Sequence, residues 1–289
     1  MNILWPYDPF LRDAKLDKIG KDILLNFFPN DKIEAVYVAS EAEVELSYAY
    51  NIPERYQFNL YPRNLIEKQL LKLKLKNTKV KVLKSDFIST SKMTGDLITY
   101  AKNSKTDLVV LASNAKKDIP KFIFGSFAET FLHLSKTDTL VFNQKSSFLD
   151  QRPKKILYAH DFTLRGSKGL LKAAAYAQKW DATLYVHHLP VQVPELTDED
   201  FVFSLENNLR KCEHLLQKMK VKFVIKNLID DLTRDDYTVA ESILHYAVKN
   251  RIDIITMTTQ ASKLERVLGG SVSRQVLRES KKPVLIFKI

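Results

Sequence analysis

Short apolar runs recur along the chain, and patterns typical of amphipathic helices lie between them. The runs are rich in β-branched and large apolar residues without strict alternation, which is typical of strands covered on both faces. We predict strands at Asn2–Tyr7, Ile33–Ala39, Val80–Leu83, Leu108–Ala112, Thr139–Phe142, Ile156–Ala159, Thr183–His188, Phe223–Leu228, Ile254–Met257 and Val284–Phe287. We predict helices at Asp13–Phe28, Pro62–Leu75, Thr94–Asn103, Ser126–Leu134, Ser167–Trp180, Asp198–Met219, Thr238–Asn250 and Ser271–Glu279. Because strands and helices alternate, the pattern predicts parallel sheets joined by right-handed crossovers.

The order of elements repeats once, and short motifs repeat with it. Gly125-Ser126 and Gly270-Ser271 are 145 residues apart, and the same offset relates Leu140–Phe142 to Leu285–Phe287. Two copies of one domain explain these matches most simply. We therefore predict an α/β protein with two doubly wound, Rossmann-like domains, each with a five-stranded parallel sheet and helices on both faces.

Length and composition agree with two folded domains. The chain has 289 residues, about twice a typical domain of ~100–150 residues, and 45% of them are hydrophobic. We place the domains at residues 1–145 and 152–289, with a polar join between them. No apolar run approaches the ~20 residues of a membrane-spanning helix, and the first residues do not resemble a secretory signal. We therefore expect a cytoplasmic protein that does not associate with membranes.

The net charge is +11, and both halves of the chain share it. Residues 1–150 carry 22 Lys and Arg against 18 Asp and Glu, and residues 151–289 carry 23 against 16. The densest lysine run, which we call the Lys68–Lys84 face, comprises Lys68, Lys72, Lys74, Lys76, Lys79, Lys81 and Lys84. Some of these lysines alternate with apolar residues, which favours the solvated side of a helix end and an edge strand. A groove for the phosphate backbone of nucleic acid is the alternative, and we do not expect nucleic acid as the main partner.

Each repeat combines two features of a nucleotide site in an open α/β sheet. Its first strand ends in an aspartate, Asp8 or Asp161, and a later strand precedes Gly-Ser at a helix start. Ligands bind to such sheets beyond the carboxyl ends of the strands, where the strand order reverses. A helix N-terminus offers unpaired N–H groups to phosphate there, and serine adds a hydroxyl. The residues at the helix starts are Gly125 and Ser126 in the first repeat, and Gly270, Ser271, Val272 and Ser273 in the second.

At these motifs the sequence resembles the universal stress protein family in its tandem form, over nearly the whole chain. The stretch Ile156–Asp161 is similar to the family's first strand with its nucleotide-facing aspartate, and Arg278–Ile286 is similar to the family's ending. By position, Val38 and Leu189 match the end of the second strand, where the family's backbone meets adenine. The resemblance implies a non-enzymatic stress-response protein whose two domains pack as a pseudo-dimer.

The phosphate loop departs from the family pattern in both repeats. The family has Gly-x-x-Gly, nine residues and then Gly-Ser, whereas the first repeat has Ala112 and Ala115 at the two glycine positions. The second loop is one residue short, with Thr258 and Ala261 at these positions when counted from the strand, or Met257 and Gln260 when counted back from the helix. Glycine lets such a loop reach positive φ and lets the backbone approach phosphate. We therefore expect no resident cofactor and only weak binding of AMP or ATP, with the second repeat as the better site.

The sequence contains no set of residues typical of a metal site or of catalysis. His187 and His188 are adjacent on a predicted strand, and a zinc site of one of them with His160 and Asp161 is the alternative to histidines of the core. Cys212, the single cysteine, lies mid-helix, so we interpret it as structural. No Gly-x-Ser-x-Gly, P-loop lysine motif or His-Glu-x-x-His occurs. We therefore predict no enzymatic turnover.

The expected partners follow from the apolar sheet edges. Thr139–Phe142 and Val284–Phe287 are short and apolar, and we expect the two domains to pair within the chain through these strands. A homodimer is a further assembly that agrees with the family.

The alternatives to the stress-protein function are a polyanion-binding protein that uses the Lys68–Lys84 face and an adenine-nucleotide sensor. An enzyme of the wider nucleotide-binding α/β group comes third, because it would need a catalytic set that the sequence lacks.

Overall fold

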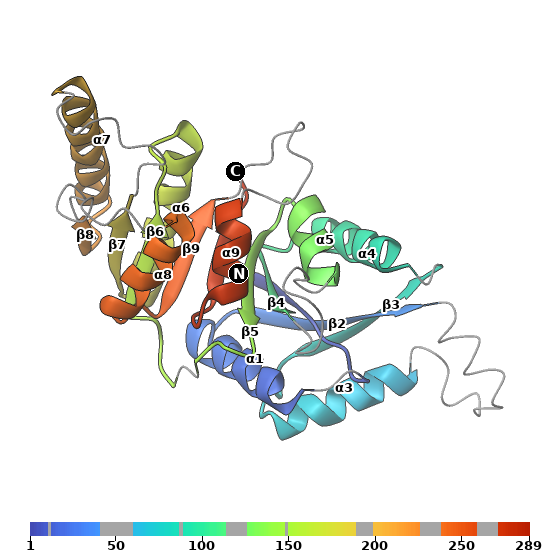
Figure 1. Cartoon of the computed structure of the whole chain (residues 1–289). Helices are drawn as coiled ribbons and strands as arrows, with labels where there is room; N and C mark the ends of the chain where they lie inside the picture. The colour runs from blue at the N-terminus through green and yellow to red at the C-terminus, as the bar shows by residue number, and fades with distance from the viewer. Residues whose placement is uncertain are drawn as a thin grey trace. The chain divides into compact units, whose positions relative to one another are not determined.

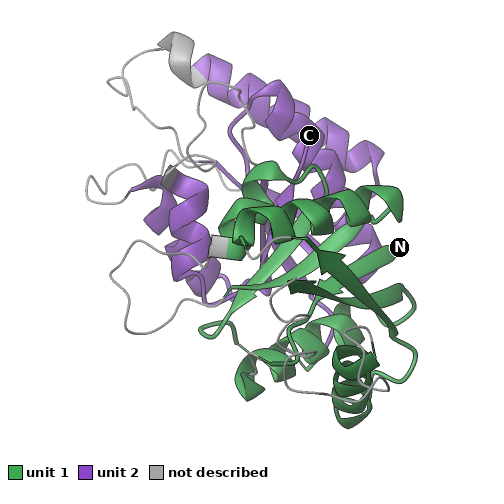
Figure 2. Ribbon diagram, turned by 90° about the vertical axis from the view of Figure 1, so that its right-hand side faces the viewer, with its two compact units in different colours: residues 1–150 green, residues 151–289 purple. Residues whose placement is uncertain are grey.

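The computed structural model describes residues 1–10, 13–40, 60–86, 89–113, 126–147, 150–188, 199–225, 238–258 and 271–289. The chain divides into unit 1, Met1–Asp150, and unit 2, Gln151–Ile289 (Figure 2). Each unit has five strands among its described residues. The domain bounds given above, residues 1–145 and 152–289, stay a prediction.

Unit 1 has, in its described residues, a five-stranded parallel sheet between two layers of helices. Its strands are β1 (Asn2–Pro6), β2 (Lys32–Ser40), β3 (Lys79–Ser85), β4 (Leu108–Ser113) and β5 (Asp138–Asn143), in the order β3-β2-β1-β4-β5. Its helices are α1 (Ala14–Phe27), α3 (Leu60–Lys72), α4 (Thr90–Asn103) and α5 (Ser126–Leu134). In Figure 1, α1 and α3 lie below this sheet, and α4 and α5 lie above it.

Unit 2 repeats this arrangement in the residues that the structure describes. Its strands are β6 (Lys155–Ala159), β7 (Thr183–His187), β8 (Phe223–Ile225), β9 (Ile254–Thr258) and β10 (Val284–Phe287), all parallel and in the order β8-β7-β6-β9-β10. Its helices are α6 (Leu164–Trp180), α7 (Glu199–Lys218), α8 (Val239–Lys249) and α9 (Ser271–Glu279). α6 packs against α7, and α8 packs against α9. α8 lies in front of β6 in Figure 1.

Both sheets are doubly wound, as the sequence predicts. In unit 1 the chain passes from β1 to β2 and β3, and then continues with β4 and β5 on the other side of β1. Unit 2 does the same around β6, with β7 and β8 on one side and β9 and β10 on the other. The strand order therefore reverses between β1 and β4 and between β6 and β9. In open α/β sheets these are the positions where ligands bind.

α1 shows how the sequence pattern becomes structure. Asp13 has an extended backbone, and its side chain accepts hydrogen bonds from the N–H groups of Lys15 and Leu16 at 2.9 and 3.1 Å. Such a cap satisfies donors that the first helical turn leaves without partners. The apolar stripe predicted on this helix, Leu16, Ile19, Ile23 and Leu24, is buried against the sheet. Each such side chain contributes roughly 1.5–3 kcal/mol when it is fully buried.

The predicted start of α4 is wrong. The sequence pattern places a cap at Thr94, but the helix begins at Thr90 and its cap is Ser89, whose hydroxyl accepts the N–H of Lys92 at 3.2 Å. Thr94 lies inside the helix, where its hydroxyl donates to the carbonyl of Thr90 at 2.6 Å. Serine and threonine serve either as caps or as such interior donors, so residue type alone does not distinguish the two roles.

The predicted strand Phe223–Leu228 is described as far as Ile225, and its last three residues lie outside the described residues.

The Lys68–Lys84 face lies on the surface of unit 1. All seven of its lysines are exposed, on α3, on the turn that follows, and on β3. β3 is the last strand of its sheet, next to β2. This placement matches the predicted solvated helix end and edge strand. Charged side chains on an edge strand oppose pairing with another chain.

None of the helices in the described parts of the chain has the length and apolar character that a membrane crossing requires.

Candidate functional site

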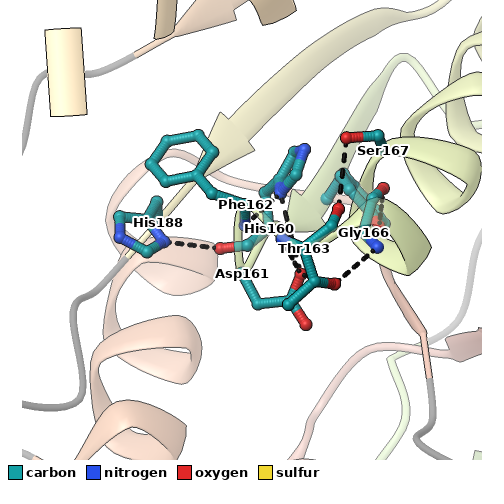
Figure 3. Close-up of polar contacts among 8 residues, drawn as sticks. His160, Asp161, Phe162, Thr163, Gly166, Ser167 and His188 are labelled. Atoms are coloured by element: carbon teal, nitrogen blue, oxygen red, sulfur yellow. Dashed lines mark hydrogen bonds and ion pairs between the residues drawn. The ribbon is translucent and has the colours of Figure 1, made fainter. Parts of the chain in front are cut away.

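The connection from β6 to α6 is short and is closed by its own side chains (Figure 3). The chain leaves β6 through His160–Phe162 and enters α6 after Thr163. Thr163 has an extended backbone, and its hydroxyl oxygen accepts the N–H of Gly166 at 3.0 Å. This cap starts the helix at Leu164, so the predicted start at Ser167 is wrong. The helix therefore begins directly beside the end of β6.

Asp161 is held in a defined position in this turn. Its Oδ1 accepts the backbone N–H of Thr163 at 3.0 Å and the Thr163 hydroxyl at 2.7 Å. The side chain is 44% exposed, and its Oδ2 accepts no hydrogen bond from any described residue. One carboxylate oxygen thus fixes the side chain, while the other is open to a ligand at the point where the strand order reverses.

Two glycines let α6 approach the sheet this closely. A Cβ at Gly166 would overlap with Oδ1 of Asp161 and would lie 3.0 Å from the ring of His160. A Cβ at Gly169 would overlap with the Cγ2 of Thr258 on β9 and with the hydroxyl of Tyr158 on β6. Neither glycine is among the site residues predicted from the sequence, because the family motif has its glycines in the phosphate loop. The available signal was two glycines three residues apart inside a helix, where each costs roughly 1 kcal/mol relative to alanine.

Tyr158 and Thr258 join the central strands beneath the turn. Tyr158 is fully buried, and its hydroxyl donates to the carbonyl oxygen of Gly166 at 2.6 Å. Burial is the main cause that raises the pKa of Tyr158 above its usual range, and a hydrogen bond with Thr258 opposes it. The hydroxyl is therefore a protonated donor that ties β6 to the first turn of α6.

His160 is a buried, neutral part of the same turn. Its Nδ1 accepts the N–H of Phe162 at 2.7 Å, which assigns the ring hydrogen to Nε2. Burial is the main cause that lowers the pKa of His160 to about 4, although the nearby carboxylate of Asp161 opposes the shift. The distance of 4.0 Å between Nδ1 and Oδ1 of Asp161 would suit an ion pair. Because the ring is neutral near pH 7, the contact is not one.

Aromatic packing holds the backbone of the turn. Phe162 has a φ of 55°, in the left-handed region that favours glycine and costs other residues roughly 1 kcal/mol or more. Its ring packs against those of His160 and His188, with centroid distances of 5.0 and 4.1 Å. His188 donates from Nδ1 to the carbonyl of His160 at 2.8 Å, and burial lowers its pKa. These contacts stabilise the strained residue next to Asp161.

The histidines of this region do not form the alternative zinc site in the described residues. No three His, Cys, Asp or Glu side chains gather there in a way that could hold a metal ion. The Nδ1 of His160 accepts the backbone N–H of Phe162. His187 contacts the hydroxyl of Ser242 at 3.2 Å, and its ring stacks on that of Tyr246 at a centroid distance of 4.4 Å. These contacts are those of core histidines.

Two further elements of unit 2, β9 and α9, carry other residues that the sequence predicts for the site. Thr258 is the last residue of β9, next to β6. Ser271 is the first residue of α9, with half-buried Val272 and buried Ser273 after it. Leu189, Ala261 and Gly270 lie outside the described residues, so their predicted roles rest on the sequence alone.

Unit 1 places its predicted residues at the equivalent positions. The Oδ1 of Asp8 accepts the N–H of Phe10 at 2.8 Å, in a turn that follows β1. Val38 is buried on β2, and Ala112 is half-buried on β4. Ser126 is the first residue of α5, and Ala115 and Gly125 lie outside the described residues.

Cys212 has the structural role that the sequence predicts. It is buried on α7, and burial is the main cause that raises the pKa of its thiol to about 11. Because the thiolate is the reactive form of cysteine, this side chain is a poor nucleophile at neutral pH.

Comparison with known proteins decides the family. The model of the universal stress protein family matches the chain twice, at residues 1–143 and 153–288. The chain belongs to the universal stress protein family. It carries two family domains in tandem, as the sequence motifs predict. No curated protein sequence matches the chain.

Solved structures show the same fold over the length of this universal stress protein. A universal stress protein from Archaeoglobus fulgidus DSM 4304 aligns with 99% of this chain and 96% of its own, at 18% identity and a TM-score of 0.68. A protein of unknown function from Pseudomonas aeruginosa PAO1 aligns with 99% of this chain and 92% of its own, at 14% identity and a TM-score of 0.62. At these identities the likeness shows the fold.

Proposed function

We propose that this universal stress protein acts in the stress response by binding, without turnover, and that unit 2 binds an adenine nucleotide weakly. The observation that carries the proposal is the fixed carboxylate of Asp161, which keeps one oxygen open at the reversal point of the sheet. A preorganised acceptor is available there to a ligand donor such as an amino or hydroxyl group. The phosphate end has lost the loop glycines of the family, which supports weak rather than tight binding.

The absence of turnover is supported by the state of the candidate reactive groups. Cys212 has a raised pKa, and His160 is buried with its Nδ1 engaged by the backbone. Neither group is suited to act as a nucleophile or a general base. We expect the purified protein to hydrolyse ATP no faster than background. An activity that co-purifies with the protein and disappears in Asp161→Ala would overturn this part of the proposal.

Calorimetric titration with AMP and with ATP tests the nucleotide site. Several charge-assisted contacts to phosphate, each worth roughly 1.5–3 kcal/mol, are lost with the glycine loop, so ATP should bind at least tenfold more weakly than to an intact family site. AMP should then bind about as well as ATP. Sub-micromolar affinity for ATP would contradict the proposed loss of contacts to the phosphate groups.

A conservative variant separates the open oxygen of Asp161 from its structural role. Asp161→Asn retains an Oδ1 that accepts from Thr163 and replaces Oδ2 by an amide that donates. We expect this change to lower AMP affinity about tenfold without unfolding unit 2, whereas Asp8→Asn in unit 1 should leave the measured affinity unchanged. Equal effects of the two variants would show that Asp161 has no special part in binding.

We also propose that the two units pair through β5 and β10. Each strand lies at an edge of the five-stranded sheet of its own unit, and β10 is buried throughout. Unpaired apolar edges favour association. Native-state hydrogen exchange tests this proposal: the amides of β5 and β10 that point away from their own sheets should exchange slowly. Rapid exchange of both sets would contradict the pairing.

Polyanion binding by the Lys68–Lys84 face is the second candidate function. Among the described residues, one ion pair involves these lysines, between Lys84 and Asp86 at 3.8 Å, so six of the seven ammonium groups remain without a carboxylate partner. Binding through such groups releases counterions and weakens steeply with salt. We expect duplex DNA of mixed sequence to bind with a salt slope that falls in the double variant Lys79→Gln/Lys81→Gln. A slope that is the same in the variant would exclude this face.

A further inference from the structure

A pocket of about 560 Å³ lies between α6 and α7 in unit 2. Its volume falls within the roughly 300–1,000 Å³ of small-molecule sites. Phe162, at the end of the turn that holds Asp161, lines it on the α6 side. The pocket therefore adjoins the proposed nucleotide site without including Asp161.

The inner wall of the pocket is apolar. Leu170 on α6 is fully buried, Cys212 on α7 is 6% exposed, and Leu215 is half-buried beside them. The ring of Phe162 is fixed by its contacts with His160 and His188. This wall offers an ordered apolar surface, including one aromatic ring, to the body of a ligand.

The rim of the pocket is positively charged. Arg210, Lys211 and Lys218 line it from α7, and no acidic residue is among the described residues of the lining. Arg210 contacts Glu206, one turn earlier on α7, at 3.5 Å, but its side chain is 74% exposed, so this pair is weak. Lys211 and Lys218 form no ion pair with any described residue. An anionic group at the rim would therefore meet two lysines without an acidic partner among the described residues and an arginine whose ion pair is weak.

We propose that this pocket binds a small amphiphilic anion. An apolar or aromatic body lies against Phe162, Leu170 and Leu215, and one acidic group lies against Arg210 and Lys211. Lys218 is in the last turn of α7, where the partial negative charge of the helix C-terminus favours a cation and disfavours an anion. The acidic group is therefore better placed at Arg210 and Lys211. The pairing of an apolar wall with an unneutralised rim selects against ligands that carry only one of the two properties.

Fluorescence titration of the full chain with 8-anilinonaphthalene-1-sulfonate, an aromatic sulfonate, tests the proposal. We expect one equivalent to bind, and Arg210→Gln/Lys211→Gln to weaken binding at least tenfold, because charge-assisted contacts are lost. The matched control Lys249→Gln/Arg251→Gln removes two exposed charges outside the pocket and should change the affinity by less than twofold. Since this dye also binds partly unfolded proteins, near-ultraviolet circular dichroism must show native packing in each variant.

Competition separates the two properties of the ligand. Dodecanoate, which has an apolar chain and a carboxylate, should displace the dye, and inorganic phosphate at the same concentration should not. Failure of the unmodified protein to bind the dye at millimolar concentration would overturn the proposal. Equal affinities of the unmodified protein and the pocket variant, or displacement by phosphate as effective as that by dodecanoate, would also do so.

Discussion

The two units share one hydrogen bond in the turn after their first strands, but they connect this turn to the next helix differently. Asp8 accepts the N–H of Phe10 at 2.8 Å, and Asp161 accepts the N–H of Thr163 at 3.0 Å, so each aspartate bonds to the residue two positions later. In unit 2 that residue also caps α6. In unit 1 the cap of α1 is Asp13, five residues after Asp8. The same hydrogen bond between an aspartate and the residue two positions later therefore holds Asp161 next to the start of α6 and holds Asp8 several residues before the start of α1.

The residues around the aspartates differ in a related way. Tyr7 precedes Asp8 and donates its hydroxyl to buried Asp17 on α1 at 3.2 Å, whereas His160 precedes Asp161 and accepts the N–H of Phe162 within the turn. In unit 1 the residue before the aspartate is thus hydrogen-bonded to α1, whereas in unit 2 the residue before the aspartate is hydrogen-bonded within the turn. The comparison indicates that unit 2 has the more strongly preorganised site.

The largest expected difference concerns the glycine that faces the first strand in each unit. A Cβ at Gly169 would overlap with fully buried Tyr158 and with Thr258, whereas a Cβ at Gly20 would lie 3.0 Å from Trp5 and Phe142. We expect Gly169→Ala to lower the free energy of unfolding of unit 2 by about 3 kcal/mol, because neither neighbour can move freely. Gly20→Ala should cost unit 1 less than about 1 kcal/mol, since alanine also has the higher helix propensity.

Urea denaturation can report each unit separately, because the chain has two tryptophans, Trp5 in unit 1 and Trp180 in unit 2. Fluorescence of a Trp5→Phe background then follows unit 2, and that of Trp180→Phe follows unit 1. Gly95→Ala is a useful control, because a Cβ there would meet nothing within 4 Å. It should leave α4 unchanged or stabilise it slightly. Equal losses for Gly169→Ala and Gly20→Ala would contradict the closer packing of α6.

Acid should destabilise unit 2 more than unit 1. The pKa of His160 is about 4 in the folded chain, against roughly 6.5 for an unfolded histidine. Between these values the unfolded state binds more protons, so stability falls as the pH falls through this window. From these two pKa values the loss at pH 5 is about 2 kcal/mol relative to pH 7. His188, whose pKa burial also lowers, adds to it in the same direction.

The pH effect can be assigned with His160→Gln in the Trp5→Phe background. Glutamine does not titrate, so the slope of unit 2 stability against pH should become shallower between pH 7 and pH 5, with the contribution of His188 remaining. Unit 1 has a tyrosine, Tyr7, instead of a histidine at the equivalent position. A slope that His160→Gln leaves intact would show that the buried imidazole is not the source.

The smallest expected effect concerns the helix caps. Thr163→Ala should cost unit 2 about 1 kcal/mol, the usual value for a lost cap. It should also weaken AMP binding several-fold, because Oδ1 of Asp161 loses the hydroxyl donor and keeps only the backbone N–H of residue 163. Asp13→Ala should cost unit 1 a similar amount without any effect on AMP. Thr163→Ser keeps the hydroxyl and should restore both properties. Equal loss of AMP affinity in Thr163→Ala and Asp13→Ala would break the proposed link between cap and site.

Much of the architecture could be predicted from local patterns. The short apolar runs and the apolar stripe of α1 become the central strands and a helix face, because burial on both faces of a sheet requires such residues. Gly-Ser and a later apolar strand recur 145 residues apart, and this repeat predicted two domains because similar motifs at the same spacing indicate two copies of one fold. The aspartates after the first strands could be found because Asp8 directly follows an apolar run and Asp161 follows one after a single histidine.

Tertiary structure alone decided how the site is built. Gly166 and Gly169 matter because α6 lies against β6 and β9, and the contact of Gly169 with Thr258 joins residues 89 positions apart in the chain. The neutral state of His160 depends on burial and on one backbone N–H, neither of which residue type reveals. Thr94 and Thr163 look alike in sequence, yet one is a donor inside a helix and the other a cap. Local sequence sets which conformations are available, and the packing of distant segments selects among them.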